Sequence, residues 1–364
     1  MDEAAVNSSG AVPEVEMERI VRSPVLAALI AAAAFVLALD ARAAASTAAP
    51  TVENKTDATF QQLLDAANAV VIVKSHALPN ARSNPYLGEE RAGSGVLIAP
   101  SGLVLTIGYL ILEADTVDIV TSKGRTVPAT VTAYDHATGF GLLRPIGPLD
   151  VKPIALGASS SVEELDRLMI ATGGGEESVT VATVVSRRPF AGYWEYLIDN
   201  AIFTSPPRAD HSGAALINKD GELVGIGSLF VMDAMTPGKR LPGNMFVPID
   251  LLKPVLGEMI ATGRQKAGIR PWLGMSSLEE DGRIKVLRVS EEGPAEQAGI
   301  EPGDIILAMS GQKVDRLDEF YRRLWSAGAP GIDVKLKVLH GAEIREVTVH
   351  SIDRLDFIRR KPSI

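Results

Sequence analysis

Ser212 is the residue whose surroundings in the sequence best suit covalent chemistry. It lies in the polar run Asp210-His211-Ser212-Gly213, directly before an apolar segment. A serine hydroxyl attacks a carbonyl group when an imidazole accepts its proton and a carboxylate orients that imidazole. His211 is adjacent, but neighbours in a tight turn usually point in different directions, so we expect it to line a pocket or the surface. The run therefore offers a nucleophile without a clear base.

The other four histidines are expected to be ordinary solvated side chains. They fall in a loop, in a turn beside Asp135, at a hairpin tip and at a strand end: His76, His136, His340 and His350. No pair of them has the spacing of metal ligands on one helix. The chain has no cysteine, which excludes disulfides, thiolate zinc sites and cysteine nucleophiles. We therefore predict neither a metal nor a cofactor.

The N-terminal segment has the composition of a secretory signal. Arg19 and Arg22 precede an apolar run over residues 24–39, and small residues follow over 41–45. A basic start, an apolar centre and a small-residue end are typical of such signals. We predict a signal peptide over residues 1–45, with an N-terminal anchor through residues 24–39 as the alternative, and a linker over 46–59. Either form places the remaining chain in the periplasm or the cell envelope.

Length and charge limit the remaining possibilities. With 364 residues, the chain can form two compact domains in addition to the export segment. The net charge is −9, and no basic stripe could neutralise phosphates. These properties argue against a nucleic-acid partner.

The pattern after residue 60 is that of a mostly β protein. Two groups of about six short β-runs with turn signals between them predict two stacked barrels over residues 60–263. The last part of this domain has helical spacing and a stop at Gly263. A smaller α+β domain is predicted over 264–352, with one amphipathic helix that carries Phe320 and Leu324. A basic tail is predicted over residues 353–364, and its run Arg359-Arg360-Lys361 is expected to be solvated.

Several blocks resemble HtrA/Deg-type trypsin-like serine proteases that carry a C-terminal PDZ domain. The blocks of the barrel part are Gly93–Ile98, Gly102–Thr106, Tyr134–Thr138, Ser212–Asn218 and Met245–Pro248. The PDZ-like blocks are Arg270–Met275, Gly293–Ala295, Ala298–Ile300 and Gly303–Ile306. Their order and spacing span residues 60–350. The resemblance implies a chymotrypsin/trypsin-like double β-barrel followed by a PDZ domain.

The resemblance also assigns the catalytic positions, and most of them are altered. Ser212 takes the nucleophile position, Tyr109 the base position and Gly139 the carboxylate position. A phenol with a pKa of about 10 is protonated at neutral pH and is a poor general base, and glycine has no side chain. Asp210 stands where the family has an oxyanion-hole glycine, so a carboxylate would oppose the developing negative charge. We therefore favour a structural role for the Ser-Gly turn and predict no useful peptidase activity.

The PDZ part retains the features of a peptide-binding domain. A PDZ domain adds a peptide as a strand and binds its terminal carboxylate with backbone N–H groups. The resemblance assigns that loop to Trp272, Leu273, Gly274 and Met275. Phe320 and Leu324 are expected to line the pocket, with a pure core role as the alternative. Trp272 is expected to pack against the preceding linker.

Three functions follow from these predictions. The leading one is an exported pseudoprotease whose PDZ domain binds peptide or protein C-termini in envelope quality control or regulation. It could assemble with copies of itself or with active HtrA-like proteases. The second is a residual serine endopeptidase that uses Ser212. The third is a structural or chaperone-like protein whose barrel holds unfolded segments.

Overall fold

The computed structural model describes residues 52–174, 178–265 and 269–359. The predicted export segment lies outside these residues. Within them, no helix combines the length and the apolar character that crossing a bilayer requires. The first helix, α2 (Val52–Asn68), begins inside the predicted linker and continues beyond it. The run Val52-Glu53-Asn54-Lys55 contains neither glycine nor proline, so nothing in it prevents helix formation.

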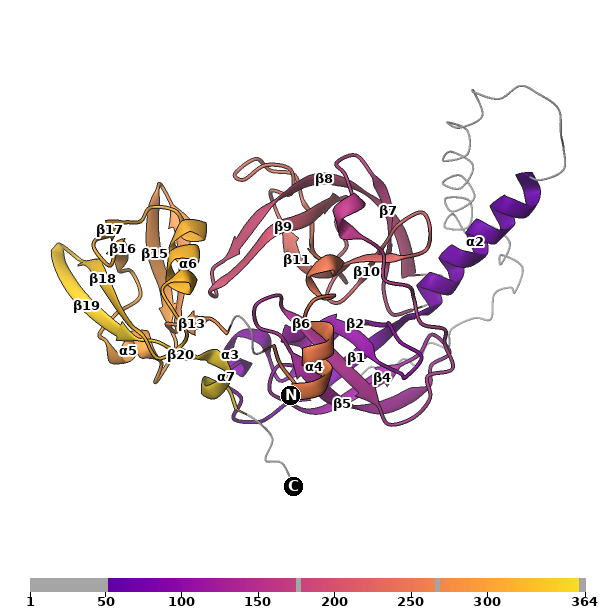
Figure 1. Ribbon diagram of the computed structural model, residues 1–364, viewed down its shortest axis with the longest axis horizontal. Helices are drawn as coiled ribbons and strands as arrows, with labels where there is room; N and C mark the ends of the chain where they lie inside the picture. Colours follow the sequence, from indigo (N-terminus) through magenta and orange to yellow (C-terminus); the bar gives the residue numbers. More distant parts are fainter. Residues whose placement is uncertain (1–51, 175–177, 266–268, 360–364) are drawn as a thin grey trace, which may run out of the picture. The chain divides into compact units, whose positions relative to one another are not determined.

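The first barrel is closed and contains six antiparallel strands (Figure 1). The strands are β1 (Val70–Ala77), β2 (Glu90–Leu97), β3 (Val104–Ile107), β4 (Ala114–Val120), β5 (Thr126–Tyr134) and β6 (Phe140–Pro145). They pair in the order β1-β2-β3-β6-β5-β4. A helical turn, α3 (Asn84–Leu87), lies between β1 and β2, and the 3-10 turn η1 (Gly108–Leu110) directly follows β3. Tyr109 lies on η1.

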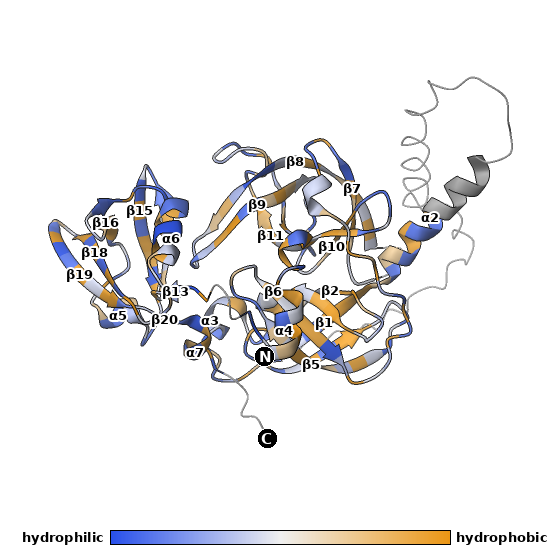
Figure 2. Cartoon of the chain, viewed as in Figure 1, coloured by the Kyte–Doolittle hydropathy of each residue, from blue (hydrophilic) through white to orange (hydrophobic). Residues whose placement is uncertain are grey.

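The second barrel is also closed, with the strand order β10-β11-β12-β9-β8-β7. Its strands are β7 (Arg167–Ala171), β8 (Val179–Gly192), β9 (Tyr196–Ser205), β10 (Ala215–Ile217), β11 (Leu223–Val231) and β12 (Gly243–Pro248). The 3-10 turns η2 (Ser159–Ser161) and η4 (Ile249–Leu251) flank it. Helix α4 (Leu256–Thr262) ends at Gly263, whose φ of 77° fits the predicted stop. Apolar residues colour much of the strands of both barrels (Figure 2).

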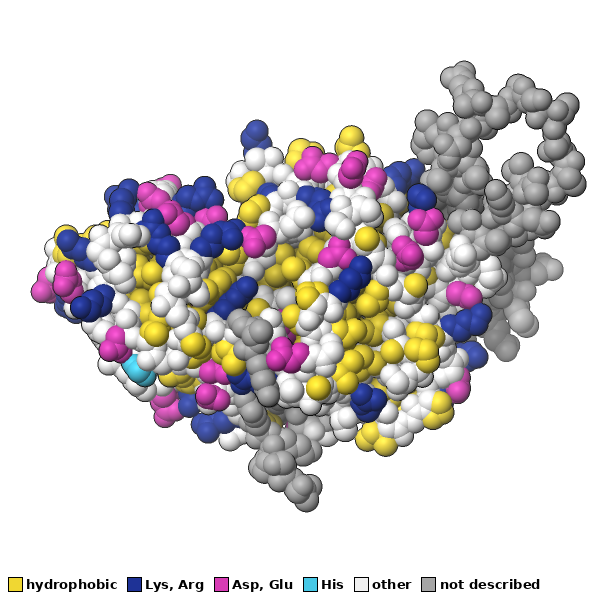
Figure 3. Space-filling model, in the orientation of Figure 1, with side chains coloured by type: hydrophobic (Ala, Val, Ile, Leu, Met, Phe, Trp, Pro, Cys, Tyr) yellow, Lys and Arg dark blue, Asp and Glu magenta, His cyan; other side chains and the backbone are white. Residues whose placement is uncertain are grey.

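The third domain contains a six-stranded antiparallel sheet, in which five strands follow the order β14-β15-β16-β18-β19 and β17 pairs with β16. The elements are β13 (Pro271–Trp272), β14 (Met275–Glu280), β15 (Arg283–Val289), α5 (Pro294–Gln297), β16 (Ile305–Met309), β17 (Gln312–Lys313), α6 (Leu317–Ser326), β18 (Asp333–His340), β19 (Glu343–His350), β20 (Ile352–Asp353) and α7 (Arg354–Phe357). The predicted fold class, a mostly β double barrel followed by an α+β domain, is confirmed. Basic and acidic side chains are intermixed over the face shown in Figure 3.

Residues 353–359 of the C-terminal tail contact the rest of the chain, while Arg359, which belongs to the run expected to be solvated, is itself exposed. Strand β20 pairs with β13, and Asp353 forms an ion pair of 2.5 Å with Arg264. The ring of Phe357 packs against Trp272 at 4.7 Å between ring centroids. The Arg359 backbone N–H donates to Glu113 at 2.6 Å. Trp272 therefore contacts the tail, whereas the sequence placed it against the preceding linker.

The hairpin of β8 and β9 carries residues of the second barrel to the third domain. Its tip, Tyr193-Trp194-Glu195, follows the 14-residue strand β8. Tyr193 accepts a backbone hydrogen bond of 2.8 Å from Ser277 on β14. Leu197 at the start of β9 joins the buried core of the third domain. The hairpin therefore connects the barrel that carries Ser212 to the domain that carries the predicted peptide-binding loop.

Candidate functional site

The hydroxyl of Tyr109 occupies the space beside Ser212. The phenol oxygen lies 2.8 Å from Ser212 Oγ and 2.8 Å from the backbone oxygen of Ser228. Ser228 lies on β11 at a register shift between Gly227 and Leu229, so its carbonyl is not needed in the strand ladder there. Tyr109 thereby joins the first barrel to two segments of the second. The structure brings the predicted nucleophile and base positions together, as the sequence expected.

The hydrogen bonds around Tyr109 fix the direction of the Ser212 proton. A phenol has one proton, and a carbonyl oxygen only accepts. The Tyr109 proton therefore satisfies the Ser228 carbonyl, which leaves Ser212 Oγ–H to donate to the phenol oxygen. Burial raises the pKa of Tyr109 to about 12, although the Ser212 hydrogen bond lowers it. Roughly one molecule in 10⁵ would hold a phenolate at pH 7. Tyr109 cannot accept the serine proton as an ordinary base.

A second tyrosine, Tyr196, packs against Gly139, the predicted carboxylate position. Gly139 has a φ of +79°, which favours glycine, and a Cβ atom added there would lie 3.1 Å from the hydroxyl of Tyr196. Tyr196 donates to the backbone oxygen of Thr138 at 2.6 Å. The nearby Asp135 accepts from the Thr138 backbone N–H at 3.0 Å and from its hydroxyl. Its carboxylate is therefore engaged in the turn.

Asp210 is tied into an ion pair. Arg208 donates to its carboxylate from Nη2 at 2.6 Å and from Nε at 2.8 Å, and the Thr172 hydroxyl donates at 2.9 Å. The hydrogen bond from Arg208 keeps the pKa of Asp210 below its ordinary value. The carboxylate is thus charged and partnered. The sequence predicted the negative charge of Asp210 but not its pairing with Arg208. The positive charge of Arg208 weakens the repulsion that Asp210 would exert on an oxyanion.

The five histidines all lie in the described part of the chain, and none of them forms a hydrogen bond with Ser212 there. His211 Nδ1 lies 3.1 Å from the Arg208 backbone oxygen, and His76 pairs with Glu90. His340 and His350 contact Asp304 and Asp333. His136 is the exception to the expected solvated state: it contacts Tyr134 and Arg354, and burial together with Arg354 holds its pKa well below the ordinary value. His340 is also partly buried beside the buried Asp304.

The predicted carboxylate-binding loop holds a carboxylate from the same chain. The backbone N–H groups of Leu273, Gly274 and Met275 donate to the side chain of Glu195 at 3.0, 2.8 and 3.1 Å. Gly274 has a φ of +80°, a conformation that turns consecutive amides toward one acceptor. Trp272 lies at the start of the loop and packs on Phe357. Its backbone N–H is not among the donors to Glu195.

The predicted pocket residues lie in the core of the third domain. Phe320 and Leu324 are fully buried, and the same apolar cluster includes Leu197 from β9. Sequence reasoning missed Glu195, Leu197 and Tyr321. The available signal was an acidic residue inside the aromatic run Tyr193–Tyr196, but its partners lie about 80 positions away. Spacing along the chain cannot reveal that contact.

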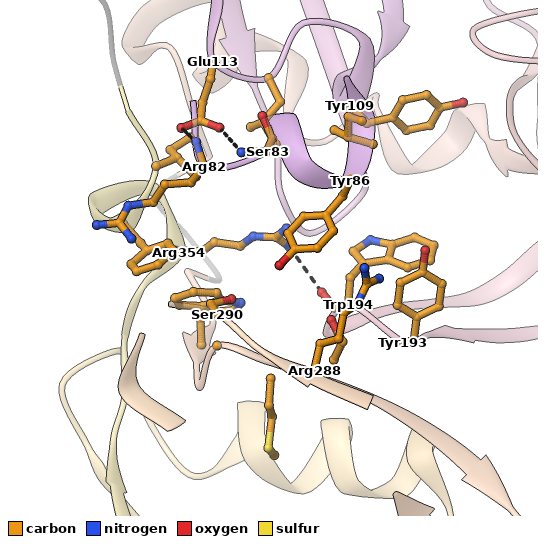
Figure 4. Close-up of a pocket in the computed structure, with 18 of the residues that line it drawn as sticks. Arg82, Ser83, Tyr86, Tyr109, Glu113, Tyr193, Trp194, Arg288, Ser290 and Arg354 are labelled. Atoms are coloured by element: carbon orange, nitrogen blue, oxygen red, sulfur yellow. Dashed lines mark hydrogen bonds between the residues drawn. The ribbon is translucent and has the colours of Figure 1, made fainter. Parts of the chain in front are cut away.

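A cavity of about 330 Å³ is lined by residues of the barrels and of the third domain. Tyr109, His211 and Ser228 line its barrel side, and Met275 and Arg288 line the other. The guanidinium of Arg288 lies 4.4 Å from the ring centroid of Tyr86. Figure 4 shows Tyr193 and Trp194 of the hairpin tip among the side chains around this cavity. Glu113 accepts from the backbone N–H groups of Arg82 and Ser83 at its edge.

Comparison with known proteins identifies both domains. Residues 93–226 match the trypsin-like peptidase domain, and residues 271–350 match the PDZ domain. The periplasmic pH-dependent serine endoprotease DegQ of Escherichia coli is 29% identical over 289 residues, which cover 75% of this chain and 61% of DegQ. The serine endoprotease DegS of Haemophilus influenzae is 28% identical over 288 residues, with 73% and 81% covered.

Two further matches agree with these. A probable periplasmic serine endoprotease DegP-like protein of Halomonas elongata is 27% identical over 280 residues, which cover 72% of this chain and 56% of the relative. The present chain thus spans little more than half of that relative. The solved structure of the HtrA-type protease AlgW with decapeptide has a TM-score of 0.50 at 22% identity, with 84% of this chain and 99% of that chain covered. The chain thus carries a trypsin-like peptidase domain followed by a PDZ domain, and it is similar in sequence to the DegQ, DegS and DegP-like serine endoproteases.

Proposed function

We propose that this protein is an HtrA-family pseudoprotease that binds peptide or protein C-termini through its PDZ domain in the cell envelope. The observation that carries the proposal is the contact of 2.8 Å between the Tyr109 hydroxyl and Ser212 Oγ. It puts a protonated phenol where a peptidase needs a base, while the Ser228 carbonyl holds that phenol in place.

The size of the catalytic deficit supports this conclusion. In well-studied serine proteases, the loss of triad members reduces turnover by on the order of 10⁴–10⁶. Here the base is replaced by a phenol with a pKa of about 12. The carboxylate position is a glycine against which Tyr196 is packed. Both changes act on the same proton transfer, so we expect Ser212 to be unreactive.

The PDZ loop supports the binding role. Three of its amides already hold the carboxylate of Glu195, which is the group that a peptide C-terminus would present. Ser277 of β14 already pairs with an added backbone segment at Tyr193. The names of the DegQ and DegP-like relatives include the word periplasmic, and the predicted export segment agrees with an envelope location. Assembly with itself or with active relatives is part of the proposal.

The test of the pseudoprotease part uses the purified mature chain and its Ser212→Ala variant. Casein and quenched-peptide hydrolysis should be equal in the two proteins, and a fluorophosphonate should label neither. Labelling of the parent chain that disappears in Ser212→Ala would support the residual endopeptidase instead. The test of the binding part compares peptides with a free C-terminus and their C-terminal amides. Binding of both forms with equal affinity would contradict carboxylate recognition.

A further inference from the structure

We propose that the β8–β9 hairpin tip is an internal ligand of the PDZ groove, which an incoming C-terminal peptide must displace. This inference rests on the proposed binding function and concerns the regulation of that site. Three features of a bound C-terminus are present in the hairpin: a carboxylate, a paired backbone and an apolar side chain.

The carboxylate of Glu195 occupies the anion site completely. One of its oxygens accepts from Gly274 at 2.8 Å and from Met275 at 3.1 Å, and the other accepts from Leu273 at 3.0 Å. Glu195 is 4% exposed, so solvent and ligands do not reach these amides while the hairpin is seated. A free peptide carboxylate would need the same three donors.

The backbone before Glu195 follows the path of an added strand. Tyr193, two residues earlier, accepts from the Ser277 N–H on β14 at 2.8 Å. Ser277 itself lies two residues after Met275, the last donor of the loop. The separation from Tyr193 to Glu195 on the hairpin therefore equals the separation from Met275 to Ser277 on β14. This equal spacing is that of antiparallel strand addition. The hairpin tip thus uses the sheet edge that a peptide would use.

Leu197 supplies the apolar part of the internal ligand. It is 6% exposed and belongs to the cluster that contains Phe320 and Leu324 of α6. Ala191 on β8 packs against the same cluster. A competing peptide must replace this buried side chain as well as the carboxylate. We therefore expect ligands that end in a leucine-sized apolar residue with a free carboxylate.

Helix α6 clamps the hairpin at two further points. Tyr321 donates to the Gly192 backbone oxygen at 3.0 Å and accepts from the Glu195 N–H at 3.2 Å. Arg322 contacts the exposed Asp199 of β9. Glu195 itself has a φ of +57°, which non-glycine residues rarely adopt and which often marks switch regions. The tip is therefore strained and is held in place by these contacts, which suits it to release.

Release of the hairpin would also alter the neighbouring cavity. Tyr193 and Trp194 line it together with Tyr109 and Arg288. If the tip leaves the groove, Tyr193 and Trp194 no longer line the cavity.

The first measurement is amide hydrogen exchange in the full chain. In Glu195→Ala, the Ser277 amide should exchange at least tenfold faster than in the parent chain, because the strand pairing at Tyr193 is lost with the hairpin. Ser277 does not contact the Glu195 side chain, so its amide reports the position of the hairpin. Glu346→Gln, an exposed change on the opposite edge strand β19, is the control and should leave the rate unchanged.

The second measurement is the affinity of a fluorescein-labelled decapeptide that ends in Val-Leu with a free carboxylate. Glu195→Ala should bind it at least about tenfold more tightly than the parent chain, because the internal competitor is removed. Asp199→Arg, which repels Arg322 without touching the groove, should also increase affinity and provides a second variant if Glu195→Ala folds poorly. Melting curves establish that each variant is folded.

The outcomes separate the two proposals. Equal Ser277 exchange and equal affinity in the parent chain and both variants would overturn the internal ligand while leaving peptide binding intact. Faster exchange without binding of the free-carboxylate peptide would contradict the peptide-binding function, and with it the competition. Faster exchange together with tighter binding, absent for the peptide amide, supports both.

Discussion

The hydroxyl of Tyr196 lies 3.1 Å from the position that a Cβ atom at Gly139 would occupy. The space beside Gly139, the predicted carboxylate position, is therefore filled by a neighbouring side chain. A carboxylate side chain placed at residue 139 would have to displace Tyr196, whose hydroxyl donates to the Thr138 backbone oxygen. Any side chain introduced at residue 139 must therefore compete with Tyr196 for the same space.

We predict that Tyr109→His combined with Gly139→Asp does not restore peptidase activity. Aspartate at 139 would need a φ near +79° and would crowd Tyr196, so its carboxylate could not orient an imidazole at 109. Casein hydrolysis by the double variant should equal that of the same variant with Ser212→Ala. Hydrolysis that requires Ser212 would show that the barrel can still accommodate a triad.

The Gly139 contact can be measured separately from its backbone strain. Gly139→Ala and Gly124→Ala both place a side chain at positive φ, but Gly124 has no atom within 4 Å of the added Cβ. We expect each to lose about 1 kcal/mol from strain, and Gly139→Ala to lose about 1 kcal/mol more from the Tyr196 contact. Urea denaturation measures both. Equal losses would mean that Tyr196 does not fill the position.

The Tyr109 hydroxyl is predicted to stabilise the fold. Tyr109→Phe leaves the buried Ser228 carbonyl without its phenol donor and should lower the free energy of unfolding by about 1–3 kcal/mol. Tyr86→Phe is the control, because Tyr86 is 54% exposed and should change stability by less than about 0.5 kcal/mol. Equal stability of the two variants would show that the phenol does not hold the barrels together.

Gly213 gives a structural reason for the Ser-Gly pair. Its φ is +74°, and an added Cβ would lie 1.9 Å from the backbone oxygen of Ser94. Ser94 also donates its N–H to the Ser212 oxygen at 2.7 Å, so its backbone cannot move freely. We expect Gly213→Ala to cost more than about 3 kcal/mol or to prevent folding, and Ser212→Ala to cost about 1 kcal/mol or less. A Gly213→Ala chain that melts like its parent would remove this structural explanation.

The barrels and the third domain could be predicted from the sequence because their signals are local. Alternating apolar residues and dipeptides such as Asp220-Gly221 specify strands and turns without knowledge of distant contacts. The role of Glu195 could not be predicted, because it depends on how a hairpin of one domain meets a loop of another. The contact of Phe357 with Trp272 and the hydrogen bond of the Arg359 backbone to Glu113 escaped for the same reason, because each joins the tail to a residue far away along the chain.

Peptide binding is predicted to strengthen as the pH rises from 5 to 8. Burial raises the pKa of Glu195 to about 7 in the seated hairpin, against the opposing effects of the Leu273 and Met275 amides and of Arg354. The other titratable group that faces it is Tyr321 of α6, which stays protonated because burial raises its pKa. In a released hairpin the Glu195 pKa would return to its ordinary value of about 4.3.

The direction of this pH dependence follows from proton linkage. The seated state binds the proton more tightly than the released state, so its stability is greatest below the released pKa and is lost as the pH rises through about 7. The terminal carboxylate of a free peptide is ionised throughout this range. We expect the affinity of the free-carboxylate decapeptide to increase about tenfold or more between pH 5 and pH 8, measured by fluorescence anisotropy. Glu195→Ala should bind equally at both pH values, whereas an equal pH dependence in that variant would assign the effect to another group.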